Sequence, residues 1–355
     1  MVTDPQSDPA TDPRARYDYE GGSVARSGLV ADLDARVDGE VRFDEYSRQM
    51  YATDASAYEV TPIGVVFPTD TADVATVVEY CAKRSIPVLP RGGGTSLAGQ
   101  TVNRAVVLDL SRHMDGLVGV GPYERTARAQ PGIILGELNA ELEDAGLKFA
   151  PDPAWGDKSV LGGAIGNNST GAHSLKYGKT DTYVEEVEVV LADGTVTTFG
   201  EVPAEELDAL ADPDGDLEAS IYAAVRDVLA EEADAVTEAY PDLKRNVSGY
   251  NLDWVVDRYH EDGVVDMAGL VTGSEGTLGV VTEAEVSLEP IPETKAMALL
   301  RYDDLVDAME DVAPILEHDP AAVEVLDDVL LDLARGTEEF GDLVAEMVPE
   351  GTGAV

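Results

Sequence analysis

Cysteine is nearly absent from this sequence, since Cys81 is the only one among 355 residues. The chain therefore cannot form an internal disulfide, and it cannot supply the ligands of an iron–sulfur cluster or of a cysteine-rich zinc site. Cys81 shares one face of a segment with helical periodicity with Val74, Val77 and Val78. We expect it to be a buried core residue and not a reactive thiol.

Histidine is also scarce. The four histidines are isolated from one another, so no pair has the spacing of metal ligands, and we expect no metal site. They are His113, His173, His260 and His318.

Positive charge is in short supply as well. The chain has 24 basic and 70 acidic residues, and its formal net charge is -46. Nucleic-acid binding is disfavoured, because it requires clustered lysine and arginine. The acidic residues are spread along the whole chain, which favours a halophilic protein of a high-salt cytoplasm over an acidic partner-binding surface. At about 1 M salt the Debye length falls to roughly 3 Å, which screens the repulsion among carboxylates.

Long apolar runs are missing too, and none reaches the roughly 20 residues that a membrane-spanning helix requires. The N-terminus is rich in Asp and Pro and lacks the charged-then-apolar pattern of a signal peptide. We expect a cytoplasmic protein, with a peripheral position at the inner face of the membrane as the alternative.

The length and the 44% hydrophobic content allow two domains, or one large and one partial domain. We expect a polar N-terminal arm over residues 1–45, the main domain over 46–294, and the incomplete start of a second domain over 295–355. The pattern predicts an α+β fold, with strands at 65–67, 87–89, 105–110, 125–129, 185–191, 195–199, 267–271 and 280–288, and helices at 71–84, 133–145 and 217–239. After Pro292 we expect strands at 295–301 and 321–325 and helices at 304–317 and 329–333.

The most informative segment is a glycine-rich loop between two predicted strands, Pro90-Arg91-Gly92-Gly93-Gly94-Thr95-Ser96-Leu97-Ala98-Gly99-Gln100. Three consecutive glycines leave backbone N–H groups free to face a ligand, and a concave row of such donors binds anions, most often phosphate. No Gly-Lys-Ser/Thr follows, so the loop is not a Walker A motif. It leads into a strand and lacks Gly-x-Gly-x-x-Gly spacing, which argues against a Rossmann fingerprint. A glycine-rich turn that binds nothing stays open as the alternative.

Two further segments, 159–173 and 273–282, combine glycine with small hydrogen-bonding side chains. Ser159 is a candidate N-cap of a short helix, and the small residues after it leave room for a flat ring system. Three glycine-rich turns at strand or helix ends favour one long ligand, and a dinucleotide fits better than a mononucleotide. Three unrelated tight turns stay open as the alternative.

Together these segments resemble those of flavoproteins with the vanillyl-alcohol oxidase / p-cresol methylhydroxylase (PCMH) fold. The run from Gly162 to Thr180 is most similar to that of FAD-linked D-2-hydroxyacid dehydrogenases: cytochrome-type D-lactate dehydrogenase, the glycolate oxidase D subunit and D-2-hydroxyglutarate dehydrogenase. The resemblance covers residues from about Phe43 to Leu333. It implies an FAD-binding PCMH-type domain of two α/β subdomains, followed by the start of an α/β substrate cap.

The resemblance also implies which residues contact FAD. In the first loop these are Arg91, Gly92, Gly93, Gly94, Thr95 and Ser96 at the pyrophosphate, with Gly99 and Gln100 toward the flavin. The other cofactor-lining residues that it implies are Pro131, Gly132, Pro151, Asp152, Ser159, Gly162, Gly163, Asn167, Ser169 and Tyr177, and, on the adenine side, Glu275, Gly276, Leu278, Gly279 and Val280. Some family members bind FAD covalently through a histidine in the first loop. This loop has none, so we expect non-covalent FAD.

The segment Arg245-Asn246-Val247-Ser248-Gly249-Tyr250-Asn251-Leu252 resembles one that approaches the isoalloxazine ring and the substrate. A carboxylate substrate favours arginine, because a guanidinium can pair with it in a bidentate manner. Arg245 is therefore the candidate residue for the substrate carboxylate, and Lys244 is the next. For Lys244 a solvated charge at the end of a helix is the alternative.

The sequence departs from the family in one respect. The catalytic and metal-binding histidines of the family lie in a Gly-His-x-Gly-Asp-Gly-Asn-x-His-like segment after the cap domain, and nothing similar occurs here. We therefore expect the main catalytic histidine outside this chain, and the chain to be the N-terminal part of a larger enzyme, through a split gene, an interrupted gene or a shortened gene product. His173 is the only histidine in a cofactor segment, and a structural role is favoured for it.

The resemblance implies a dehydrogenase that oxidises a D-2-hydroxy acid, such as D-lactate, D-2-hydroxyglutarate or glycolate, to the 2-oxo acid. Its electron acceptor would be a quinone, a cytochrome or an iron–sulfur protein. The second interpretation is an FAD-binding module without turnover, completed by a partner chain that is encoded downstream. The third is a nucleotide-binding protein unrelated to flavin, which a yellow protein with flavin absorbance would exclude.

The net charge predicts that stability depends on salt. We expect the free energy of unfolding to rise between dilute buffer and molar KCl, because counter-ions screen the repulsion among carboxylates. Urea unfolding at a series of KCl concentrations measures this dependence. Full stability in dilute buffer would contradict the halophilic hypothesis.

Overall fold

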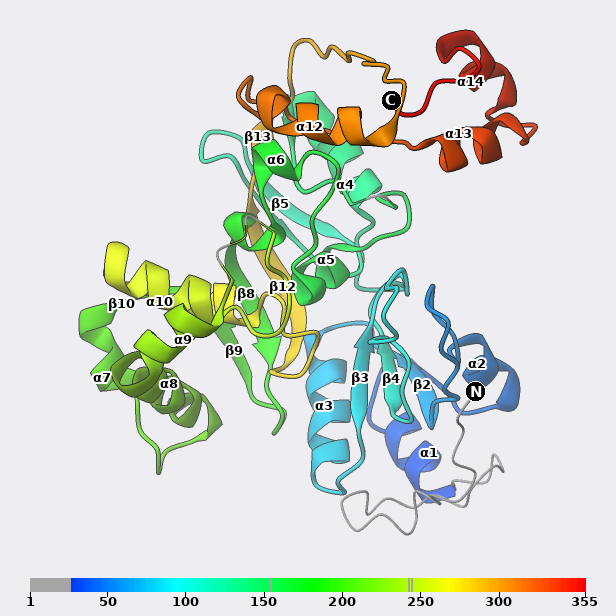
Figure 1. Ribbon diagram of the computed structural model, residues 1–355. Helices are drawn as coiled ribbons and strands as arrows, with labels where there is room; N and C mark the ends of the chain where they lie inside the picture. The colour runs from blue at the N-terminus through cyan, green and yellow to red at the C-terminus, as the bar shows by residue number, and fades with distance from the viewer. Residues whose placement is uncertain (1–26, 154, 242, 244) are drawn as a thin grey trace.

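The first layer of the fold is a four-stranded sheet with helices packed on it, drawn in blue and cyan (Figure 1). The computed structural model describes residues 27–355 except Ala154, Asp242 and Lys244. The strand order is β1-β2-β4-β3, in which β2, β4 and β3 are parallel and β1 is antiparallel to β2. The elements of this layer are β1 (Glu40–Arg42), β2 (Gly64–Phe67), β3 (Val88–Arg91), β4 (Val106–Asp109), α1 (Ser27–Asp34), α2 (Glu45–Met50) and α3 (Thr71–Ala82).

Both faces of this sheet are apolar, as is usual for parallel strands. Val66 and Leu108 contribute to a hydrophobic cluster with α1 and α3, while Val65 and Val107 contribute to a smaller cluster on the opposite face. Cys81 of α3 is fully buried in the first cluster, as the sequence predicts. Its burial raises the pKa of the thiol to about 12, so the thiolate is scarce at neutral pH.

Residues 27–45 belong to this layer and not to a polar arm. Leu29, Leu33 and Phe43 are buried in one cluster, and Val41 of β1 lies opposite Val66 of β2. Charged residues interrupt the apolar ones in this stretch, which suggested an arm, but Leu29, Leu33, Val37 and Phe43 are all buried in the core. The predicted arm over residues 1–45 is corrected accordingly for residues 27–45, and residues 1–26 lie outside the described residues.

A second, antiparallel sheet forms the middle of the molecule (Figure 1). Its order is β5-β6-β12-β8-β9. The strands are β5 (Leu117–Gly121), β6 (Thr126–Ala129), β8 (Val184–Val190), β9 (Val196–Phe199) and β12 (Val280–Ser287). β8 and β9 form the predicted hairpin, in which Gly194 adopts φ +90°.

Helices cover one face of this sheet. Buried and half-exposed residues alternate along β12, and Leu138, Leu161 and Ile165 of two covering helices share a cluster with Val187 and Val286 of the strands. The covering elements and those next to them are α4 (Leu135–Leu142), a 3-10 turn (Glu143–Ala145), β7 (Leu147–Lys148) paired with β13 (Glu289–Pro290), α5 (Leu161–Asn167), α6 (Ser174–Tyr177) and a second 3-10 turn (Thr180–Tyr183).

The half-exposed face of the same sheet concentrates negative charge around one arginine. The Arg128 guanidinium donates to Glu186 at 2.7 Å, to Glu283 at 3.1 Å and to Glu285 at 3.0 Å. The hydrogen bonds to these carboxylates raise the pKa of Arg128. Because like charges on neighbouring strands destabilise a sheet, this cation offsets part of the cost of the acidic surface.

A helical insertion lies beside the second sheet, on the left of the view (Figure 1). It consists of β10 (Glu201–Pro203), a 3-10 turn (Ala204–Glu206), α7 (Leu207–Leu210), α8 (Leu217–Asp227), a π-helical turn (Val228–Glu232), α9 (Ala233–Ala239), α10 (Leu252–Glu261) and β11 (Val264–Asp266), which pairs with β10. The long helix predicted over 217–239 is thus present, interrupted by the π-helical turn.

The strand predicted over 267–271 is wrong, because this segment is the helix α11 (Met267–Val271). All five residues are buried, so the apolar run has no alternation that could distinguish helix from strand. Asp266 decides the conformation: its side chain accepts a hydrogen bond from the Gly269 N–H at 2.8 Å and so caps the helix. The indole N–H of Trp254 donates to the same carboxylate at 2.7 Å.

The C-terminal region contains the predicted helices but not the predicted strands. The two predicted helices are present as α12 (Leu305–Leu316) and α13 (Asp328–Arg335), and a third helix that was not predicted follows, α14 (Gly341–Met347). Residues 295–301 and 321–325 belong to no strand, because strands require a hydrogen-bonding neighbour and neither segment has one among the described residues. Only isolated bridges from Tyr302 and Asp327 to Ala354 occur next to them. Met297 and Leu300 stay exposed as a result.

The two sheets are joined through α3. One carboxylate oxygen of Glu188 on β8 accepts hydrogen bonds from Thr71 of α3 and Thr282 of β12, both at 2.7 Å. Val190 and Val280 extend from the second sheet into the hydrophobic cluster of the first. The strand ends that carry the glycine-rich turns therefore meet at the boundary between the two subdomains.

Within the described ranges, no helix is long and apolar enough to cross a membrane. The same residues contain no group of three or more His, Cys, Asp or Glu side chains that could hold a metal ion.

Candidate functional site

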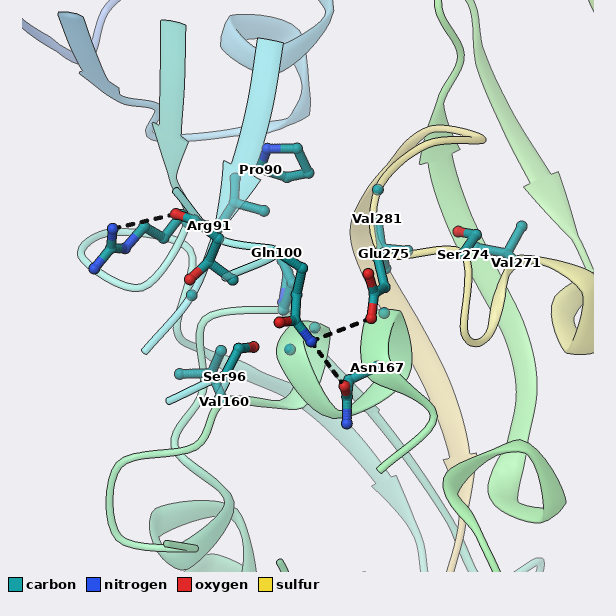
Figure 2. Close-up of a pocket in the computed structure, with 18 of the residues that line it drawn as sticks. Pro90, Arg91, Ser96, Gln100, Val160, Asn167, Val271, Ser274, Glu275 and Val281 are labelled. Atoms are coloured by element: carbon teal, nitrogen blue, oxygen red, sulfur yellow. Dashed lines mark hydrogen bonds between the residues drawn. The ribbon is translucent and has the colours of Figure 1, made fainter. Parts of the chain in front are cut away.

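The three glycine-rich turns meet in a cleft between the two subdomains. The first follows β3, the second includes α5, and the third lies between α11 and β12. Together they line three adjoining cavities, a central one of about 90 Å³ and two outer ones of about 460 and 490 Å³. Figure 2 shows residues from all three turns facing one another around the central cavity.

Gln100 connects the three turns. Its side-chain amide donates to the side-chain oxygen Oδ1 of Asn167 at 3.3 Å and to the Glu275 carboxylate at 3.2 Å, and these bonds are drawn in Figure 2. Both contacts are acceptors, which fixes the orientation of the amide. The amide oxygen Oε1 is then buried without a hydrogen-bond partner among the described residues. Gln100 lines all three cavities, so a ligand that passes through the cleft can donate a hydrogen bond to this oxygen.

Two positions of the first turn must be glycine because the second turn packs directly against them. A Cβ at Gly92 would lie 2.2 Å from Val160, and one at Gly93 would lie 2.1 Å from the Lys158 carbonyl oxygen. A larger side chain at Gly93 is therefore excluded by the neighbouring backbone. The hydroxyls of Thr95 and Ser159 meet at 3.3 Å across the same contact.

Two glycines of α5 have no such packing reason. The nearest atom to an added Cβ would be 3.5 Å away at Gly163 and 3.7 Å away at Gly166, which is ordinary contact. Glycine inside a helix costs about 0.5–1 kcal/mol relative to alanine. Since both residues line the central cavity, their missing side chains leave open the backbone surface that a flat ligand would occupy.

The third turn docks on the end of α5. The N–H groups of Gly273 and Glu275 donate to the carbonyls of Ile165 and Gly166 at 2.9 and 2.8 Å. The Ile165 carbonyl also accepts the Asn168 N–H at 3.0 Å, so it is the Gly166 carbonyl at the helix C-terminus that the third turn satisfies. The turn uses positive φ angles at Gly273, Glu275 and Gly276, and for Glu275 this is the sparsely populated left-handed region.

Arg91 does not direct its charge into the cleft. Its guanidinium donates to the backbone carbonyls of Tyr51, Thr53 and Thr101 at 3.2, 2.7 and 3.3 Å, and it lies 5.1 Å from the centre of the Tyr51 ring. Burial lowers the pKa of this guanidinium, although arginine stays charged. The Tyr51 hydroxyl is in turn held by the Asp109 carboxylate. Arg91 thus supports the first turn from beneath, and only part of it lines the cleft.

Most of the residues that the sequence analysis assigned to the cofactor line these cavities. They are Arg91, Gly92, Gly93, Gly94, Thr95, Ser96, Gln100, Pro131, Ser159, Gly162, Gly163, Asn167, Ser169, Glu275, Gly276, Leu278, Gly279 and Val280. Five do not: Gly99, Gly132, Pro151, Asp152 and Tyr177. Gly99 packs on Tyr58 and Gly132 packs on Leu110, so glycine at these two positions allows close packing within the protein.

One further expectation differs from the structure, and four other residues lie outside the cavities or outside the described residues. α5 begins after Val160 with no side-chain cap, so Ser159 is not its N-cap. The Asp152 carboxylate contacts His173 at 3.1 Å, and both side chains are partly exposed outside the cavities. Arg245 is exposed and lines none of the three cavities, while Lys244 lies outside the described residues.

Sequence reasoning missed the apolar floor of the central cavity. Leu110, Val160, Val271 and Val281 line it, together with Gly166 and Ser274. These residues look like ordinary core residues in the sequence, and only their position at the ends of strands and helices near the glycine turns could have indicated them.

FAD fits this site on three counts. The cleft is elongated, and its walls are backbone with few bulky side chains. Gln100 Oε1, the buried polar atom of the cleft that has no partner among the described residues, is an acceptor that faces the ligand space. Among the described lining residues there is no His, Cys or Tyr side chain for covalent attachment.

Replacement of Gly163 by alanine separates helix stability from ligand binding. We expect Gly163→Ala to raise the free energy of unfolding of the ligand-free protein by about 0.5–1 kcal/mol, since alanine favours a helix. FAD affinity should fall about tenfold or more, because the methyl group occupies the cleft and over-packing costs about 1–3 kcal/mol. Urea unfolding and flavin fluorescence titration measure the two effects.

Gly119→Ala in β5 is the control, because no atom lies within 4 Å of the added Cβ and the residue lies outside the cleft. It should leave FAD affinity unchanged. Unaltered FAD affinity in Gly163→Ala would show that the ligand does not lie against α5.

Comparisons with known proteins find an FAD-binding domain in part of this chain. The model of the FAD binding domain family matches residues 62–200. D-2-hydroxyglutarate dehydrogenase of Pseudomonas putida is 33% identical over 83% of this chain, which corresponds to 29% of the relative. Glycolate oxidase subunit GlcD of Bacillus subtilis is 32% identical over 86% of this chain and 55% of its own. The chain thus spans between about a third and about half of the length of these relatives.

A solved structure of alkyldihydroxyacetonephosphate synthase shares the fold, with a TM-score of 0.62 at 19% identity over 92% of this chain and 54% of its own. The chain contains an FAD-binding domain of the PCMH type and is homologous to D-2-hydroxyglutarate dehydrogenase and GlcD over the N-terminal part of those proteins.

Proposed function

We propose that this chain binds FAD non-covalently in the cleft of the three glycine turns and serves an enzyme that oxidises a D-2-hydroxy acid to the 2-oxo acid. The observation that carries the proposal is the convergence of the three turns on Gln100. The names of the relatives supply the substrate class, with D-2-hydroxyglutarate, glycolate and D-lactate as the candidates.

The backbone of the first turn would hold the pyrophosphate. Gly92 to Ser96 line the cleft with N–H groups and two hydroxyls, which are suited to a phosphate anion without a fixed cation. Gly163 and Gly166 would lie against a flat part of the cofactor, and Gln100 would accept a hydrogen bond from it. Bound FAD supplies the acceptor for the hydride that leaves the substrate's α carbon.

The described residues supply fewer candidates for binding the substrate than for binding the cofactor. We propose that Arg245 pairs with the substrate carboxylate, because it starts the exposed segment that packs beside the third turn, where Tyr250 contacts Thr277 at 2.9 Å. A base must also take the hydroxyl proton. No histidine lines the described cavities, so we propose that another part of the enzyme supplies this base.

We propose that the FAD-binding domain extends to residue 294 and that residues 295–355 begin the substrate cap. Residues 295–301 are exposed and unpaired in the described structure, and Met297 is 82% exposed. This favours the alternative function, an FAD-binding module that turns over only with a partner chain carrying the catalytic histidine and the electron-transfer domain. A quinone, a cytochrome or an iron–sulfur protein would accept the electrons, and the net charge of -46 favours a high-salt cytoplasm as the setting.

Non-covalent attachment predicts complete release of the flavin. We expect acid precipitation of the FAD-loaded protein to leave all flavin absorbance in the supernatant, because no His, Cys or Tyr side chain lines the described cleft. The absorbance spectra of the supernatant and the pellet measure this. Flavin that remains in the pellet would contradict non-covalent binding, and a protein that binds no flavin would overturn the proposed function.

The FAD-loaded chain of 355 residues should show little or no turnover alone. Loss of a general base removes about 10²–10⁴-fold in rate, and loss of substrate positioning removes more. Dye reduction with D-lactate, D-2-hydroxyglutarate and glycolate measures the activity. Turnover on the order of 10 s⁻¹, typical of enzymes, would show that this chain holds the complete active site.

A further inference from the structure

A buried ionic cluster connects the second glycine turn to the segment that carries Arg245. Lys179 lies 2.8 Å from the Asp181 carboxylate, and the exposed fractions of the two side chains are 14% and 0%. The same carboxylate oxygen accepts hydrogen bonds from the side-chain amides of Asn168 at 2.7 Å and Asn251 at 3.0 Å. Asp181 is therefore satisfied from three directions.

Lys179 has a second acceptor in addition to this ion pair. Its ammonium group donates to the backbone carbonyl of Asn246 at 2.9 Å. Asn246 follows Arg245 directly, so the lysine holds the start of the exposed segment. A compact ammonium with rotatable donors can serve a carboxylate and a carbonyl together.

The far end of the segment is fixed to cofactor-lining turns as well. Tyr250 contacts Thr277 of the third turn at 2.9 Å, and Asn251 reaches Asp181. Apolar packing contributes little between these ends, since Val247 and Tyr250 are 40% and 41% exposed. Polar contacts therefore hold residues 246–251, to Lys179 and Asp181 and to Thr277 of the third turn. Two more reach neighbouring helices: the Tyr240 hydroxyl donates to the Tyr250 carbonyl at 2.6 Å, and the Asn251 amide donates to the Gly269 carbonyl at 3.3 Å.

Asn168 completes the connection to the cleft. It adopts the left-handed conformation at φ +48° directly after Asn167, which lines the cavities and contacts Gln100. Its side chain also accepts the Asp181 N–H at 3.0 Å. A displacement of Asn167 by a ligand would therefore be transmitted through Asn168 and Asp181 to Lys179.

We propose that Lys179 and Asp181 are positioning residues that place the Arg245–Asn251 segment according to the occupancy of the FAD cleft. The inference rests on the proposed function, since FAD is the ligand that would occupy the cleft. It adds that the position of Arg245, the candidate substrate-binding residue, depends on whether the cofactor is bound.

Trypsin tests this proposal, because it cuts after Lys244 and Arg245 at the start of the segment. In the native chain FAD should slow this cut severalfold. Lys179→Met should speed the cut about tenfold and abolish the effect of FAD, since a hydrogen bond from a charged group is lost at a locally opening segment. Lys179→Arg should restore most of the protection. Mass spectrometry of the fragments gives the rates.

A second trypsin site distinguishes a local opening of the segment from a loss of global stability. Cleavage after Arg125, an exposed turn residue far along the chain from the segment, should be the same in all variants. Lys83→Met, which removes an exposed pair with Glu79, is the matched control. The double variant Lys179→Met/Asp181→Asn leaves no buried unpaired charge, so it should fold while still exposing the cut after Arg245.

Two results would overturn the proposal. One is that Lys179→Met changes the rate of cleavage after residues 244 and 245 by less than twofold. The other is a parallel rise after Arg125, which would assign a purely structural role to the pair. If the native chain binds no FAD, the proposed function fails, while the FAD-free cleavage rates still decide whether Lys179 holds the segment.

Discussion

The close approach of three backbone turns at Gln100 is the contact on which the rest of this structure depends. The turns come from residues around 92, 162 and 275, and they can meet only where no side chain intervenes. Gly92 and Gly93 admit the second turn, and Gly276 admits Pro90 of the first. The two sheets, α3 and the Glu188 contacts hold the strand ends at the distance that this meeting requires. The cleft is therefore a consequence of how the subdomains dock.

Few of the positive charges near the cleft are available to a ligand. Five of the seven lysines lie between residues 148 and 244, yet Lys148 and Lys176 lie over the Tyr177 ring, and Lys179 is held by Asp181. Arg91 is committed to backbone carbonyls. The proposed pyrophosphate site would thus rely on backbone N–H groups and hydroxyls, whose short-range hydrogen bonds are far less sensitive to salt than surface ion pairs.

The contacts between segments 162–180 and 245–251 concern a question that the glycine turns do not answer, namely where the substrate-binding side chain lies. Glycine turns specify where a dinucleotide can lie, but they do not place a substrate-binding side chain. That placement depends on Asp181, a carboxylate that the sequence analysis did not single out. Its importance comes from burial and from its three donors, and neither can be read from a linear pattern.

The sequence by itself determined the α+β architecture, seven strands of the two sheets (β2, β3, β4, β6, β8, β9 and β12), the longer helices α3, α8 and α12, and the turns that line the cleft, because glycine spacing and hydrophobic periodicity are local properties. Tertiary structure alone decided the remainder. Leu29, Leu33 and Phe43 joined the core only through contacts with β2 and α3, and residues 267–271 became a helix through the Asp266 cap. Residues 295–301 stayed unpaired because a strand needs a neighbour. Arg91 turned away from the cleft because three carbonyls beneath it offered better partners than open solvent, and such acceptors are brought together only by folding.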